Sequence, residues 1–116
     1  MTNWRVPLRV VFYKEGAEWV AHCLEFDLMG DGPTKKDATD QLVEAISLQV
    51  EASLLSKNLV NLFRPAEGKY LAMFAAGKDA AIGELHLKFD SITIDEAEAR
   101  EYVDPEDGSE AELACT

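Results

Sequence analysis

Residues 19–38 read WVAHCLEFDLMGDGPTKKDA and are the most informative part of the chain. It joins the end of a predicted strand to the start of a predicted helix through a compact, glycine-containing turn. Thr34 is a favourable N-cap residue. Asp37, three positions later, has the place of the acidic member of a capping box and lies near the positive end of the helix dipole. The helix is therefore expected to begin at a defined place, directly after Thr34.

A β-hairpin is expected before this stretch. Apolar residues alternate between Val6 and Tyr13, which indicates a strand, and Pro7 favours an edge or an early position within it. Residues 14–17 supply a short turn, and residues 18–23 return antiparallel to the first strand. An open edge on the first strand is a usual route to dimerisation by sheet continuation.

A long helix over residues 34–57 is expected after a short third strand over residues 26–31. Apolar side chains recur at helical spacing, as an amphipathic helix requires, at Ala38, Leu42, Ala45, Ile46, Val50 and Leu54. Val43, Leu48 and Leu55 widen this apolar surface beyond one stripe. We expect this additional apolar surface to be covered either by another subunit or by a broad core face. Its extent favours a dimer or a higher even oligomer.

The second half of the chain gives weaker signals. A short helix is expected over residues 66–76, with Gly77 in the C-terminal capping position. Alternating apolar residues within 82–94 predict one strand or a bent pair. A last short helix is expected over residues 96–102, ending before Pro105.

Together these elements predict an α+β fold. The expected architecture is a small antiparallel sheet of three to four strands, with the long helix packed on one face and a short helix near the C-terminus. A chain of 116 residues fits one domain. We expect that domain to span residues 1–103, followed by a flexible acidic tail over residues 104–116.

The charge of the chain is strongly negative and unevenly placed. The formal net charge is −11, and residues 95–116 hold nine acidic residues and one arginine, a net charge of −8. An acidic surface repels phosphate and gains no counterion release, which disfavours direct binding to nucleic acid. A basic partner would be attracted instead. The alternative is that the acidity serves only to keep the protein soluble.

The sequence contains no apolar run long enough to span a bilayer and no secretory signal. Cys23 and Cys115 lie far apart in the sequence, which argues against a disulfide framework. A cytoplasmic protein without a membrane anchor is the expectation.

No catalytic, metal or cofactor site is predicted. His22 and Cys23 are neighbours in a strand and point to opposite faces, so they cannot easily form a nucleophile and base pair, and Cys23 is expected in the core. His22 and His86 would need a third ligand to hold a metal ion. Two-metal nuclease chemistry typically requires a carboxylate in the first strand, and residues 6–13 contain none.

The segment 30–32 reads Gly-Asp-Gly and lacks the lysine and the glycine spacing of a phosphate-binding loop. Its glycines are expected to provide backbone angles that other residues cannot reach. The interpretation of Tyr13 and Trp19 depends on exposure, because exposed aromatic residues suit a protein-binding edge and buried ones are ordinary core. The candidate partner-binding residues are Tyr13, Trp19, Glu25, Asp27 and Asp31.

The order of these pieces, over residues 8–55, resembles the N-terminal domain of the HicB-like antitoxin family. That pattern is a hairpin whose second strand ends in Ala-x-Cys, a short polar loop, Gly-x-Thr and an amphipathic helix. The residues that carry the resemblance here are Ala21, Cys23, Glu25, Gly30, Gly32, Thr34, Asp37, Ala38, Leu42, Ala45 and Ile46. The chain departs from the pattern at Leu24, where the family usually has proline, and at Pro33, which separates the glycine from Thr34.

The resemblance implies a partial RNase H-like fold and a non-catalytic role. That role would be to bind and mask a small basic ribonuclease toxin of the HicA kind. Many family members carry an additional basic DNA-binding segment, whereas residues 58–116 lack a basic balance and an evident recognition helix. One alternative is a stand-alone homo-oligomeric interaction or structural protein without a toxin partner. Another is a small-ligand binder or enzyme that uses a pocket between sheet and helix.

Overall fold

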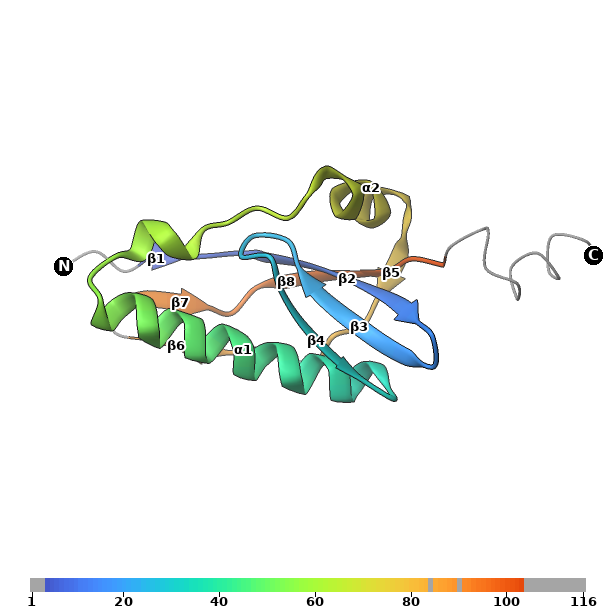
Figure 1. Ribbon diagram of the computed structural model, residues 1–116, viewed down its shortest axis with the longest axis horizontal. Coiled ribbons are helices and arrows are strands. Elements are labelled where there is room, and N and C mark those ends of the chain that lie inside the picture. Colours follow the sequence, from blue (N-terminus) through green and yellow to red (C-terminus); the bar gives the residue numbers. More distant parts are fainter. Residues whose placement is uncertain (1–3, 84, 90, 104–116) are drawn as a thin grey trace, which may run out of the picture.

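The computed structural model describes residues 4–83, 85–89 and 91–103 (Figure 1). Their elements in chain order are β1 (Trp4–Arg5), β2 (Leu8–Glu15), β3 (Glu18–Cys23), β4 (Leu28–Gly32), α1 (Lys35–Leu55), the 3₁₀ helix η1 (Leu59–Leu62), α2 (Gly68–Ala76), β5 (Lys78–Ala80), β6 (Leu87–Lys88), β7 (Ile92–Ile94) and β8 (Ala97–Glu101). The predicted α+β class is confirmed, with the long helix packed on a sheet. Across the described ranges, no helix has the length and apolarity needed to cross a membrane. The expected acidic tail, 104–116, lies outside the described residues.

The larger sheet has five strands in the order β4-β3-β2-β8-β5. Strands β2, β3 and β4 run antiparallel as predicted, with Val10 opposite Cys23 and Ala21 opposite Gly30. The hairpin between β2 and β3 turns at Gly16, whose φ of +64° is readily reached only by glycine. The sheet as a whole is mixed, because β8 pairs parallel with β2.

The helix predicted over residues 96–102 is wrong, because most of this segment forms β8. Its alanines and glutamates favour a helix locally, but pairing with β2 on one side and β5 on the other satisfies its backbone as a strand. Strand β2 consequently lies in the middle of the sheet. The expected open edge on the first strand is therefore also wrong, and β4 and β5 are the edge strands.

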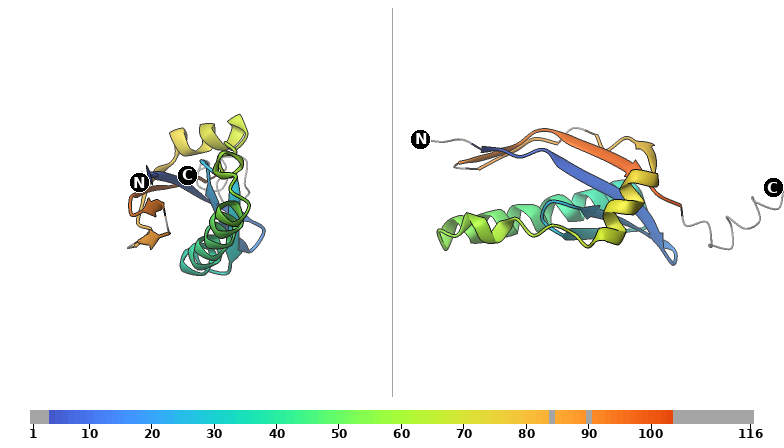
Figure 2. Two further views of the ribbon diagram at one scale, coloured as in Figure 1. Left: turned by 90° about the vertical axis from the view of Figure 1, so that its left-hand side faces the viewer. Right: turned by 90° about the horizontal axis from the view of Figure 1, so that it is seen from above.

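A smaller sheet, β1-β7-β6, continues the larger one. Strand β1 pairs parallel with β7, and β7 pairs antiparallel with β6, so the bent-pair alternative is the one found within residues 82–94. Seen from above, the segments containing β1 and β2 run beside those containing β7 and β8 (Figure 2). The ion pair between Arg5 and Asp95, at 2.8 Å, joins these segments near the transition between the two sheets.

The two faces of the larger sheet are covered by different helices (Figures 1 and 2). Leu8, Val10 and Phe12 of β2 point into the core beneath α1. Val11 and Tyr13 point to the opposite face, where they pack with residues of α2. The segment with alternating apolar residues thus forms a strand that is buried on both faces of the sheet.

Helix α1 begins where the sequence predicts. The Thr34 hydroxyl oxygen accepts a hydrogen bond from the Asp37 amide at 3.1 Å, which defines Thr34 as the N-cap. The helix ends at Leu55, two residues before the expected end. Leu48 and Leu55 are 63% and 86% exposed, so no core face covers them. Helix α2 begins two residues later than expected and ends before Gly77.

Gly30 and Gly32 allow close packing rather than unusual backbone angles, which corrects the sequence expectation. Neither glycine has a positive φ. A Cβ atom at Gly30 would lie 2.3 Å from the Leu42 nitrogen and 2.4 Å from the Ala38 carbonyl oxygen. A Cβ at Gly32 would lie 2.6 Å from the Asp37 Cβ. The glycines therefore let the backbone of α1 approach β4 closely.

Candidate functional site

A chain of polar side chains crosses the sheet face that α2 partly covers. His22 of β3 is 1% exposed. Its Nε2 lies 2.7 Å from Asp27 Oδ1, and its Nδ1 lies 3.2 Å from the hydroxyl oxygen of Tyr13 on β2. The ring of Tyr70 from α2 lies 4.2 Å from the His22 ring, measured between centroids. We call Tyr13, His22, Asp27 and Tyr70 the polar cluster.

Each nitrogen of the His22 ring has a polar partner in the polar cluster. An ionised carboxylate only accepts hydrogen bonds, so the bond between Asp27 and Nε2 uses a proton on that nitrogen. The Tyr13 hydroxyl shares the second bond with Nδ1, and the direction of that bond follows the protonation of the ring. The Met29 sulfur also lies 3.7 Å from that hydroxyl, but one proton serves one acceptor at a time. The buried imidazole thus has a partner at each nitrogen.

Burial raises the pKa of Tyr13 above its ordinary value of 10.0, and neighbouring Tyr70 and Glu15 raise it further. Tyr13 therefore stays protonated at neutral pH and is not a tyrosinate nucleophile. On the opposite sheet face, burial raises the pKa of Cys23 to about 12, so this thiol is also unreactive at neutral pH. The prediction that Cys23 is a core residue is confirmed.

An exposed surface strip runs along β4 beside the polar cluster. It consists of Asp27, Met29 and Asp31, and we call it the acidic edge. Met29 is 52% exposed, and both carboxylate residues are exposed. Met29 and Asp31 face the same side of the sheet because alternate residues of a strand do so. Asp27 has a φ of +53°, an uncommon angle for a non-glycine residue, and its carboxylate is fixed by His22.

The five predicted partner-binding residues are not gathered in one place. Tyr13 is buried and Asp27 is bonded to His22, so the structure brings these two together through the imidazole. Asp31 is exposed on β4. Trp19 packs against the core beneath α1, on the other sheet face. Glu25 forms an ion pair with Arg9 at 2.7 Å.

Two features of the acidic edge had no signal in the sequence. Met29 is one apolar residue among several in its stretch, and its exposure follows only from its place on an edge strand. Gln41 of α1 contacts both the backbone and the carboxylate of Asp31. With the Gln41 amide oriented so that its oxygen and its nitrogen each have a suitable partner, the nitrogen lies 3.2 Å from the Asp31 carbonyl oxygen and 3.0 Å from Asp31 Oδ1. This contact occupies part of the outer edge of β4, where an added strand would otherwise bind.

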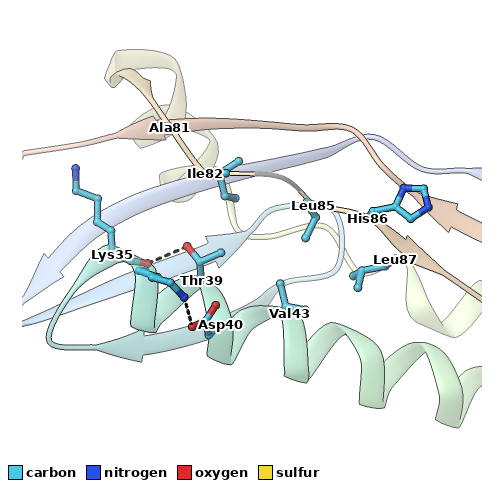
Figure 3. A pocket seen from close by; sticks show the side chains of 11 residues that line it. Lys35, Thr39, Asp40, Val43, Ala81, Ile82, Leu85, His86 and Leu87 are labelled. Carbon is cyan, nitrogen blue, oxygen red and sulfur yellow. Dashed lines mark hydrogen bonds and ion pairs between the residues drawn. The ribbon is translucent and has the colours of Figure 1, made fainter.

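A separate cleft of about 620 Å³ lies between α1 and the segment that follows β5 (Figure 3). Val43, Ile82, Leu85 and Leu87 contribute apolar side chains to it, and His86 lies near its end. Lys36 at its rim already binds Asp40 at 2.9 Å. His86 and the polar cluster lie on opposite sides of the sheet, so His22 and His86 do not form a pair.

No group of three or more His, Cys, Asp or Glu side chains within the described part of the chain is arranged to hold a metal ion. Comparison with protein-family models, with curated proteins and with solved structures finds no match for this chain.

Proposed function

We propose that this chain is a non-catalytic protein-binding module of the HicB antitoxin kind, which masks a small basic ribonuclease. The observation that carries the proposal is the acidic edge, where two carboxylates flank an exposed methionine on a sheet. Carboxylates attract a basic partner, and a methionine side chain adapts to the apolar part of an interface. The hairpin, third strand and capped helix also follow one another in the order that the resemblance implies.

The support of the acidic edge by buried residues suits a binding surface. Asp27 is held by His22, which is held in turn by Tyr13, so the carboxylate is positioned before a partner arrives. A preorganised surface loses less conformational entropy on binding. The same residues do not suit nucleophilic catalysis, because burial raises the pKa of Tyr13 and keeps its hydroxyl protonated.

The overall charge agrees with a basic protein partner and disfavours nucleic acid. The net charge of −11 would repel a phosphate backbone, whereas it would increase the rate of encounter with a cationic protein. Masking a ribonuclease then requires only that acidic and apolar groups cover its RNA-binding surface.

The test uses the product of a short basic reading frame adjacent to the gene for this chain. We expect the full chain to inhibit RNA cleavage by that protein, with binding that weakens as salt rises. Asp31→Lys and Met29→Lys should each raise the dissociation constant by about tenfold or more, because each adds a positive charge to the acidic edge. Isothermal titration calorimetry and a cleavage assay with labelled RNA measure the two effects.

Glu67→Lys is the matched control, since Glu67 is exposed and its side chain makes no capping hydrogen bond to α2. The net charge of this variant equals that of Asp31→Lys. Inhibition that is lost equally in both variants would mean that net charge alone drives binding. A basic neighbour that neither binds the chain nor is inhibited by it would refute the proposed function.

A further inference from the structure

The outward face of α1 carries two leucines that no other element of the described residues covers. Leu48 and Leu55 are 63% and 86% exposed and lie seven residues apart on the 21-residue helix. The core-facing residues Leu42, Ile46 and Val50 are buried and lie on the other side of the helix. The exposed leucines are therefore separate from the stripe that packs on the sheet.

Ala45, Leu48, Ala52 and Leu55 follow one another at intervals of three, four and three residues. This is the spacing of the a and d positions of a heptad repeat, which places the four residues along one seam of a helix. We call them the outer ridge. Small alanines alternate with leucines along it, so the backbone of a second helix could approach closely. A seam of this kind fits the side of another helix better than it fits a sheet or a loop.

The charge beside the outer ridge has one sign. Residues 41–56 contain Glu44 and Glu51 and contain no lysine or arginine, whereas Asp40, before this segment, is paired with Lys36. Glu44 and Glu51 are exposed and lie one helical turn before Leu48 and Leu55, respectively. If a second copy of this chain packed on the ridge, acidic residues of both helices would line the same seam and repel one another. A helix with lysine or arginine at its flanking positions would be attracted.

We propose that the outer ridge docks a basic amphipathic helix of another protein. The outer ridge lies on α1, which covers one face of the sheet, whereas Met29 of the acidic edge points to the other face, where its sulfur lies 3.7 Å from the Tyr13 hydroxyl. The inference thus adds a second contact surface to the molecule and does not depend on whether the acidic edge binds a ribonuclease.

The probe for this proposal is a pair of synthetic helical peptides of about three heptads each. Both have leucine and alanine at the a and d positions; one has lysine and the other glutamate at the flanking positions. Fluorescence anisotropy of labelled peptide is measured against the full chain. We expect the basic peptide to bind at least about tenfold more tightly than the acidic one. For the double variant Leu48→Ser/Leu55→Ser, we expect the affinity for the basic peptide to fall by about tenfold or more.

Met29→Ser is the matched control, since it removes an exposed apolar side chain from the acidic edge. We expect it to leave peptide affinity unchanged. Equal melting temperatures for all variants would establish that the exposed leucines do not support the fold. Peptide binding that is lost in Met29→Ser but kept in the double variant would overturn the proposal, and so would equal or absent binding of both peptides. Sedimentation that finds a dimer dissolved by the double substitution would identify a second copy as the occupant and would also overturn it.

Discussion

Beneath α1 the larger sheet meets a closely packed apolar core, whereas beneath α2 it contains a chain of polar side chains. On the α1 face, Gly30 and Gly32 bring the helix backbone into contact with β4. On the α2 face, His22 is buried but bonded at both nitrogens. The difference separates two roles. The α1 face determines whether the fold forms, and the α2 face determines where the carboxylate of Asp27 lies.

The largest effect is expected at the closest contact of the α1 face. In Gly30→Ala the new Cβ would overlap backbone atoms of Leu42 and Ala38, which cannot rotate away as a side chain could. The helix must then move from β4, and we expect the free energy of unfolding to fall by at least about 3 kcal/mol. Urea unfolding followed by circular dichroism measures this loss.

Gly68→Ala is the control for that substitution. A Cβ at Gly68 would meet no atom within 4 Å, and alanine favours the helix in which Gly68 lies. This variant should be at least as stable as the parent. If Gly30→Ala were equally stable, the close packing of α1 on β4 would not be a requirement of the fold.

The positions of the first elements could be predicted because their signals are local. Alternation between Val6 and Tyr13 indicates a strand, and Thr34 with Asp37 defines the helix start. The segment 97–101 could not be predicted in the same way. Its alanines and glutamates favour a helix, and its strand depends on a pairing with β2 that is distant in sequence.

The site was less predictable than the fold, for a related reason. Asp27 and Tyr13 were among the candidate partner-binding residues, but nothing in the sequence indicates that His22 joins them. That contact depends on the register of β2 with β3 and on the positive φ of Asp27. Likewise, the small size of Gly30 and Gly32 is required only because α1 packs against β4, and that packing cannot be read from the sequence. Sequence patterns indicate which face a residue points to, but not which distant group it meets there.

A smaller effect is expected on the α2 face. Tyr13→Phe keeps the ring but removes the hydroxyl that lies 3.2 Å from Nδ1 of the buried His22. That nitrogen loses its hydrogen-bond partner, and we expect a loss of about 1–2 kcal/mol in the free energy of unfolding. Because burial raises the pKa of Tyr13, the folded state retains the phenol proton at a pH where the unfolded chain loses it. Stability linked to Tyr13 is therefore full below pH 10.0, the ordinary pKa, and declines above it. Tyr13→Phe should lack this alkaline component.

Cys23→Ala supplies the comparison from the α1 face. The pKa of Cys23 is raised from 9.0 to about 12, so the stability linked to its protonated thiol begins to decline above pH 9.0. This decline begins at a lower pH than the decline linked to Tyr13. Urea unfolding at a series of alkaline pH values should separate the two variants in this order. If Tyr13→Phe had the same pH dependence as the parent, the tyrosine would not be held protonated by the fold.

The smallest effect is expected at the start of α1. Thr34→Ala removes the hydroxyl oxygen that accepts the Asp37 amide proton, and one of the first free amides of the helix then depends on water. We expect a loss of about 1 kcal/mol, measured by thermal unfolding. Thr39→Ala is the matched control, because Thr39 lies inside the helix, where its hydroxyl donates to the Lys35 carbonyl oxygen, and alanine there improves helix propensity. Since α1 also lies against β4, fraying of its first turn should loosen Gly32 and leave His22 in place. Proton exchange at the His22 ring, followed by NMR, should therefore be unchanged in Thr34→Ala, and faster exchange would mean that the two faces of the sheet are coupled.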